Sequence, residues 1–205
     1  MKGFWNRVSG KAKKNYVAEV VLTMALMSPI LAAERKSNIV VILADDLGWG
    51  DVSCYNPESK IKTPNIDAIA ADGLRFTDGH SNSVVCTPTR YGVLTGRYAW
   101  RSRLKRGVLN GYSPALIEPE RMTIASGLKS AGYKTACIGK WHLGMNIAKS
   151  GKEWDYTKPI EGGPIALGFD YFMGISASLD MPPYALIEND RFVQQPTETF
   201  KAIKE

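Results

Sequence analysis

Apolar positions along this chain fall into short continuous runs that alternate with segments of helical spacing. The run at residues 38–44 (NIVVILA) contains only aliphatic and β-branched side chains after its first residue. Such a run is typical of a strand that is covered on both faces, as in a parallel sheet. A shorter run at 74–77 predicts a second strand, and residues 133–138 predict a third.

Three segments predict helices that end at a glycine: 63–73, 88–96 and 123–132. The first and third of these carry apolar residues on one helical face. The first begins with Thr63-Pro64, since proline is favoured in the first turn of a helix, and Thr123 caps the third. Strands that alternate with helices predict an α/β fold. From about Gly151 onward, proline and glycine dominate and the periodicity fades, so we expect no regular element there.

The N-terminal residues are typical of a targeting segment. Lysine-rich residues 2–14 precede an apolar run at 20–33 that ends in Ala32-Ala33. This run has the length of a signal-peptide core and is short for a membrane span. Residues 1–33 therefore predict a signal peptide, with the mature protein beginning near Glu34 in the periplasm or outside the cell. An uncleaved membrane anchor is the alternative, and no other stretch is long enough to cross a bilayer.

Composition narrows the class of protein. The 205 residues are 44% hydrophobic and 22% charged, which is typical of a globular protein with one sizeable core. The net charge is +6, but residues 1–33 hold five cations and one acid, so the rest of the chain carries only +2. The densest remaining basic cluster, at 97–106, is interpreted as a solvated surface or an anion-facing loop. We therefore expect no nucleic-acid partner.

Polar side chains that could bind a ligand or take part in catalysis directly follow two of the predicted strands. Asp45 and Asp46 directly follow the first run, and Lys140 and His142 follow the third. In open α/β sheets, side chains at the carboxyl ends of neighbouring strands converge on the ligand-binding edge. The three cysteines form no CxxC pair, which argues against a zinc ribbon or a thioredoxin-like site. Cys54 and Cys137 could form a disulfide in an oxidising compartment, which would leave one cysteine over.

The remaining cysteine lies in the segment CTPTRYGVLTGR, residues 86–97, which resembles the C-x-P-x-R and T-G-R signature of sulfatases. The blocks NIVVILADDLGWGD, TPNIDAIAADGLRFTDGH and GYKTACIGKWHLG also resemble the N-terminal half of formylglycine-dependent sulfatases, in the same order. The resemblance covers about 38–144 and continues through 168–170. It implies the alkaline phosphatase-like fold, a mixed, mostly parallel sheet flanked by helices. Residues 34–205 would be the N-terminal portion of that catalytic domain, incomplete at its C-terminus.

In such sulfatases the motif cysteine, here Cys86, is oxidised to formylglycine (3-oxoalanine) by a formylglycine-generating enzyme. The hydrated aldehyde attacks the sulfur of a sulfate ester, and elimination of the sulfate restores the aldehyde. The resemblance further implies a Ca²⁺ ion held by Asp45, Asp46 and residue 86. A hard divalent cation takes such oxygen ligands and relieves the repulsion between adjacent carboxylates.

The resemblance also assigns roles to other polar side chains. Arg90, one helical turn after Cys86, would hold the hydrated aldehyde. Lys140 and His142 would contact the sulfate, and His142 would help to deprotonate the second hydroxyl. Ser178 weakly resembles a further substrate-contacting position. His80, the only other histidine, is interpreted as structural.

Two other readings remain open. The first is a phosphonate or phosphate ester hydrolase of the same superfamily, which can use a similar motif and metal. The second is an inactive fragment that binds an anion without catalysing a reaction. The remaining metal ligands of sulfatases match nothing after Gly144, so we expect these 205 residues alone to have little sulfatase activity. The expected substrate is a sulfated small molecule or glycan, and the half of the family pattern present here does not specify which.

Overall fold

The computed structural model describes residues 36–199, which form two units that divide between Asp46 and Leu47. The signal peptide expected at 1–33 lies outside the described residues. Within residues 36–199, no helix is both long and apolar enough to cross a membrane. Each unit is considered by itself below.

All three predicted helices are confirmed. They are α2 (Pro64–Asp72), α3 (Cys86–Thr95) and α4 (Ile124–Ser130), and short 3-10 turns occur at η1 (Trp49–Asp51), η2 (Ala99–Arg101) and η3 (Ile165–Leu167). Helix α3 ends at Gly96, which adopts a left-handed conformation with φ of 64°. Helix α4 is capped by Thr123, whose hydroxyl accepts a hydrogen bond from the Ser126 amide at 3.1 Å. Helix α3 starts two residues earlier than predicted, so its first residue is Cys86.

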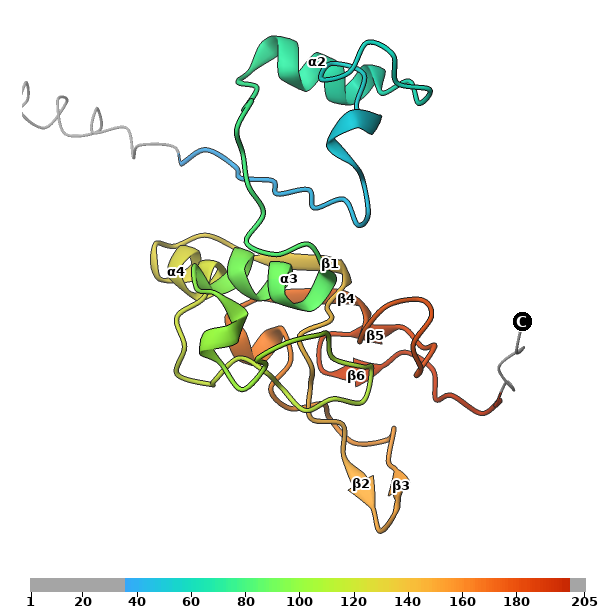
Figure 1. Cartoon of the computed structure of the whole chain (residues 1–205). Coiled ribbons are helices and arrows are strands. Elements are labelled where there is room, and N and C mark those ends of the chain that lie inside the picture. Colours follow the sequence, from blue (N-terminus) through green and yellow to red (C-terminus); the bar gives the residue numbers. More distant parts are fainter. Residues whose placement is uncertain (1–35, 200–205) are drawn as a thin grey trace, which may run out of the picture. The chain divides into compact units, whose positions relative to one another are not determined.

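A mixed four-stranded sheet forms the centre of the second unit (Figure 1). Its strands, in spatial order, are β1 (Ala136–Lys140), β4 (Tyr171–Ile175), β5 (Ile187–Glu188) and β6 (Arg191–Phe192). Strands β1 and β4 are parallel, and the two further pairings are antiparallel. A separate hairpin joins β2 (Lys149–Ser150) to β3 (Glu153–Trp154). Helices and a mixed sheet confirm the α/β class.

Several strand predictions are wrong. Residues 38–44 are extended but form no ladder within the described chain, and Val40 and Ile42 are 80% and 81% exposed. Residues 74–77 also lack strand pairing there. A strand needs a neighbour for its backbone hydrogen bonds, and apolar pattern alone does not provide one. Conversely, β4 to β6 form within the proline- and glycine-rich region where we expected no element, and β1 begins three residues late.

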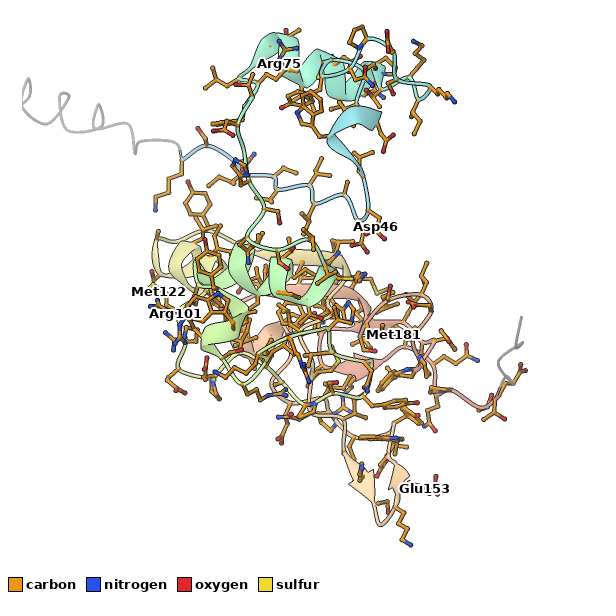
Figure 2. All side chains as sticks on the ribbon, viewed as in Figure 1. Asp46, Arg75, Arg101, Met122, Glu153 and Met181 are labelled. Atoms are coloured by element: carbon orange, nitrogen blue, oxygen red, sulfur yellow. The ribbon has the colours of Figure 1, made fainter. Side chains whose placement is uncertain are left out.

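Strands β1 and β4 approach each other closely because two glycines face each other. Gly139 and Gly174 are register partners, and a Cβ atom on Gly174 would overlap the Gly139 carbonyl. Beside them, the fully buried Phe172 contacts Trp141 edge-on, with ring centroids 6.4 Å apart. Buried side chains from α3, β4 and the segment after β1 belong to one apolar cluster. Glu153, by contrast, lies on the β2–β3 hairpin (Figure 2). This packing holds the end of β1 in place.

Candidate active site

The parallel pairing of β1 and β4 continues beyond the ends of both strands. The Trp141 amide donates to the Ile175 carbonyl, and the His142 amide donates to the Ser176 carbonyl, both at 3.0 Å. This alignment brings Lys140 beside Ser178, whose hydroxyl oxygen accepts a hydrogen bond from the Lys140 ammonium at 3.1 Å. Two residues that are 38 positions apart in the sequence thus meet at one edge of the sheet.

Arg90 joins helix α3 to the same edge. Its Nη1 atom donates to the Lys140 carbonyl at 2.6 Å, and its side chain is half-buried. The guanidinium also lies close enough to Cys137, on β1, to lower the pKa of that thiol, although burial is the larger effect and raises the pKa to about 11. The structure therefore brings together Arg90, Lys140 and Ser178, three of the predicted site residues.

Cys86 is the first residue of α3 and is half-buried. The preceding residue, Val85, is extended, so the chain enters the helix directly at the cysteine. Backbone N–H groups at a helix start favour negative charge, which suits an oxygen nucleophile or a bound anion at this position. Cys86, Cys54 and Cys137 are all free thiols, so the Cys54–Cys137 disulfide considered above does not form in this structure.

His142 is fully buried and adopts a left-handed backbone with φ of 55°. Its Nε2 atom lies 2.7 Å from the Leu109 carbonyl oxygen. Because a carbonyl can only accept, Nε2 carries a proton, and the lone pair of the neutral ring is on Nδ1. The amide of Leu109 in turn donates to the hydroxyl oxygen of Thr87 at 3.1 Å. Neither contact could be predicted from the sequence: Thr87 lies inside the motif at 86–97, but no local pattern marks Leu109.

The predicted metal ligands lie in two different units. Asp45 and Asp46 end the first unit with exposed carboxylates, and Asp46 has φ of 60°. Their proximity to residue 86 stays a prediction. Within residues 36–199, no three His, Cys, Asp or Glu side chains gather so as to hold a metal. The donor chemistry nevertheless fits Ca²⁺, because two adjacent carboxylates offer hard oxygen ligands.

His80, the second histidine, is exposed, and its Nε2 atom lies 2.7 Å from a carboxylate oxygen of Asp78. Its partner is therefore a neighbour in its own loop, and the side chains of His80 and Asp78 are 82% and 91% exposed. Such an exposed pair stabilises little, because water and salt screen it.

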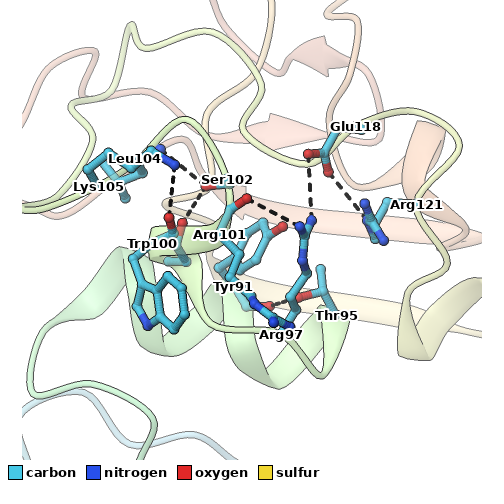
Figure 3. Close-up of polar contacts among 11 residues, drawn as sticks. Tyr91, Thr95, Arg97, Trp100, Arg101, Ser102, Leu104, Lys105, Glu118 and Arg121 are labelled. Carbon is cyan, nitrogen blue, oxygen red and sulfur yellow. Dashed lines mark hydrogen bonds and ion pairs between the residues drawn. The ribbon is translucent and has the colours of Figure 1, made fainter.

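The basic cluster at 97–106 is engaged in local structural contacts (Figure 3). Arg97 lies 4.0 Å from Glu118 and donates to the Arg101 carbonyl at 3.2 Å, while Lys105 donates to the Trp100 carbonyl at 3.0 Å. The pKa of Glu118 is lowered by a hydrogen bond with its own backbone amide and by the hydrogen bond from Arg121. These contacts are those of a surface region that orders its own loop.

A cleft of about 540 Å³ is lined by residues from the segments 110–114 and 145–154. Its lining includes the aromatic pair Tyr112 and Trp154, whose rings stack with centroids 4.7 Å apart. Lys149 places its ammonium 4.1 Å from the Trp154 ring centre. Burial, followed by the hydrogen bond with the Tyr156 hydroxyl, raises the pKa of Tyr112, so its phenol stays neutral at physiological pH. The cleft thus combines aromatic surface with one cation.

Comparison with known proteins identifies a family and several relatives of this chain. Residues 37–200 match the family model described as Sulfatase. The chain is 42% identical over 159 residues to an N-acetylgalactosamine-6-O-sulfatase of Bacteroides thetaiotaomicron, covering 78% of this chain and 30% of that protein. It is 43% identical over 153 residues to human arylsulfatase A, covering 75% of this chain and 28% of the relative.

Solved structures also resemble this chain. A structure described under the metabolism of multiple glycosaminoglycans by Bacteroides thetaiotaomicron superposes with a TM-score of 0.71 at 41% identity, covering 78% of this chain and 32% of the other. The crystal structure of Ps i-CgsB in complex with k-i-k-neocarrahexaose gives a TM-score of 0.62 at 25% identity, covering 78% and 38%. The chain thus spans about a third of the length of these matched proteins.

Proposed function

Because the chain belongs to the sulfatase family, we propose that it supplies the nucleophile-bearing part of a hydrolase that cleaves sulfate esters. The observation that carries this proposal is the meeting of Arg90, Lys140 and Ser178 at the end of β1. Two cations at one sheet edge, beside the helix that begins with Cys86, suit the binding of a sulfate group. In a site that excludes water, such fixed charges stabilise the transition state strongly.

Three residues of this chain have distinct roles in the proposed reaction. Lys140, oriented by Ser178, binds a sulfate oxygen as a fixed positive charge. Arg90, tied to the Lys140 carbonyl, holds residue 86 and neutralises anions near it. His142, with its Nε2 proton committed to Leu109, accepts a proton at Nδ1 and so assists the release of the enzyme-bound group.

Two further components are part of the proposal. Cys86 is the residue converted to formylglycine by a formylglycine-generating enzyme, and the hydrated aldehyde supplies the attacking oxygen that a thiol lacks. Asp45 and Asp46, with residue 86, would hold Ca²⁺, which would polarise an oxygen ligand and neutralise negative charge. Residues 34–205 belong to the catalytic domain, residues 1–33 are a signal peptide, and the protein is exported to the periplasm or secreted.

A sulfated glycan is the substrate class we favour. The name of the Bacteroides relative and the oligosaccharide in the Ps i-CgsB complex both support it. The cleft lined by Tyr112, Lys149 and Trp154 suits a sugar ring, since it offers aromatic surface next to polar groups and a cation.

The nucleophile provides the decisive test. The whole protein, coexpressed with a maturing enzyme, is digested and analysed by mass spectrometry for thiol-to-aldehyde conversion at Cys86 and for labelling by a hydrazide probe. Cys86→Ala should abolish hydrolysis of a chromogenic aryl sulfate without changing the unfolding midpoint, because it removes the nucleophile and little packing. Cys54→Ala, at another half-buried free cysteine, is the matched control and should keep its activity.

Three outcomes would refute this function. An unmodified Cys86 thiol, in protein made with a competent maturing enzyme, would exclude the formylglycine route. Faster hydrolysis of a phosphate or phosphonate diester than of the sulfate ester would favour the other activity of the superfamily. Sulfate binding without turnover of any ester, in fully converted protein, would identify an anion-binding module.

A further inference from the structure

The backbone of Leu109 connects the first turn of helix α3 with the buried histidine. Its amide donates to the Thr87 hydroxyl oxygen at 3.1 Å, and its carbonyl accepts the Nε2 proton of His142 at 2.7 Å. All three residues are buried, with exposed fractions of 0%, 6% and 0% for Thr87, Leu109 and His142. The amide and the carbonyl of Leu109 thus bond to two side chains, those of Thr87 and His142, which are 55 positions apart in the sequence.

The direction of this contact matters chemically. A backbone carbonyl selects the Nε2–H form of a histidine only while the carbonyl keeps its orientation. Leu109 is in an irregular segment, outside every helix and strand, so no ladder holds its backbone. The side chain of Thr87 comes from the rigid start of α3 and provides a buried acceptor for the Leu109 amide.

We propose that Thr87 is a positioning residue, which acts through the Leu109 backbone to keep His142 in its Nε2–H tautomer. Thr87 neighbours Cys86, so the helix start that carries the nucleophile also orients the histidine. In the neutral ring the proton-accepting atom is then Nδ1. The consequence for turnover rests on the proposed sulfatase function, but the effect on the tautomer does not.

Nitrogen NMR tests the tautomer directly. The 205-residue chain is labelled with ¹⁵N-histidine, and long-range proton–nitrogen correlations distinguish Nε2–H from Nδ1–H imidazole. Only two histidines are present, so His80→Gln assigns the signals. The unmodified chain should show a single Nε2–H pattern for His142. Thr87→Val, which keeps the side-chain shape and removes the acceptor, should lose that single pattern, and Thr87→Ser should restore it.

The matched control is Thr89→Val in the same helix. The Thr89 hydroxyl donates to the Ser83 carbonyl at 2.9 Å, whereas the Leu109 amide bonds to Thr87, so removal of the Thr89 hydroxyl should leave the His142 pattern unchanged. An Nδ1–H pattern in the unmodified chain would overturn the proposal even if Thr87→Val failed to fold. So would an unchanged pattern in folded Thr87→Val, or an equal change in Thr89→Val.

Turnover provides the second readout. In the whole protein, kcat for an aryl sulfate should fall about tenfold in Thr87→Val, with little change in KM, as when the group that orients an active-site histidine is lost. Because Thr87 lies in the maturation motif, kcat is divided by the formylglycine content measured by mass spectrometry. Full kcat in Thr87→Val with a changed tautomer would show that His142 orientation does not limit turnover and would overturn the catalytic part. Absence of activity in the unmodified protein would refute the proposed function and leave the tautomer result standing.

Discussion

The apolar run at 38–44 and strand β1 (Ala136–Lys140) have opposite surroundings. In the first run, Val40 and Ile42 expose about four-fifths of their surface. In the second, each residue is in register with a residue of β4, from Ala136 opposite Tyr171 to Lys140 opposite Ile175. Aliphatic and β-branched side chains favour extended backbone at 38–44, whereas Ile138 is the one β-branched residue of β1 (ACIGK). The hydrogen-bonded neighbour, and not the side-chain pattern, therefore makes the strand.

The difference extends to the candidate site residues that follow each run. The backbone of Lys140 and His142 is held in place, because the hydrogen-bonded pairing with β4 continues as far as Ser176. Asp45 and Asp46 follow a run without such pairing within the described residues, and their carboxylates are exposed. Charged and polar groups stabilise a transition state most strongly when the fold already holds them in place. The contrast between the two runs therefore bears on the function of the residues that follow them. Three experiments test it.

Among the three tests, apart from their controls, the largest effect is expected from Gly174→Ala in β4. The new methyl group would overlap the Gly139 carbonyl and push the two paired strands apart. Overpacking of this kind costs about 1–3 kcal/mol of the free energy of unfolding. Urea denaturation of the 205-residue chain, followed by tryptophan fluorescence, measures the change.

The matched control for that experiment is Gly127→Ala in α4, where a Cβ atom meets nothing within 4 Å. A helix-interior glycine replaced by alanine should gain about 0.5–1 kcal/mol. Equal effects of the two substitutions would show that the close approach of β1 and β4 is unimportant for stability.

A smaller, pH-dependent effect is expected at Asp170, just before β4. Its carboxylate lies 2.8 Å from the Lys129 ammonium and accepts from the Thr135 amide at 2.9 Å, which ties the beginnings of β4 and β1 together. The hydrogen bond from Lys129 and that from the Thr135 amide lower the pKa of Asp170 to about 2. In the unfolded chain the pKa is about 3.9.

Because the folded-state pKa is the lower one, this contribution to stability is present above the unfolded-state value and is lost as the pH falls through about 2. The difference in unfolding free energy between the unmodified chain and Asp170→Asn should therefore be constant above pH ~5 and shrink at lower pH. Urea titrations between neutral pH and pH 3 follow it. A difference that does not depend on pH would contradict the lowered pKa.

The smallest effect is expected from Ile42→Ala in the exposed run. The unfolding free energy of the 205-residue chain should change by no more than about 0.5 kcal/mol, as for other exposed positions. Ile187→Ala is the matched control, because Ile187 is 1% exposed on β5, and burial of this kind predicts a loss of about 2–5 kcal/mol. A comparable loss at Ile42 would mean that residues 38–44 are buried in solution. Repeating Ile42→Ala in the whole protein shows whether the run gains a neighbour there.

The parts of the fold that could be predicted from sequence are those governed by local chemistry. Pro64 marks the start of α2 because proline is favoured in the first helical turn, and Gly96 ends α3 because it readily adopts a left-handed conformation. The short strands β5 and β6 could not be predicted, since two-residue strands carry no periodicity and exist through pairing with β4 and with each other.

The candidate site divides in the same way. The motif beginning at Cys86 and the block containing Lys140 and His142 are contiguous in sequence, so their residue types and spacing identify the family without a structure. Ser178 was only weakly indicated, and its contact with Lys140 depends on the parallel register of β1 and β4.

By itself, then, the sequence determined the residue types of the chemistry, the helices that begin and end at capping residues, and membership of the sulfatase family. Tertiary structure alone decided which apolar run became a paired strand, and that Thr87, Leu109 and His142 form one hydrogen-bonded series. The physical reason is range. Caps and turns act over three or four residues, whereas strand pairing and buried hydrogen bonds join groups whose distance along the chain leaves no local pattern.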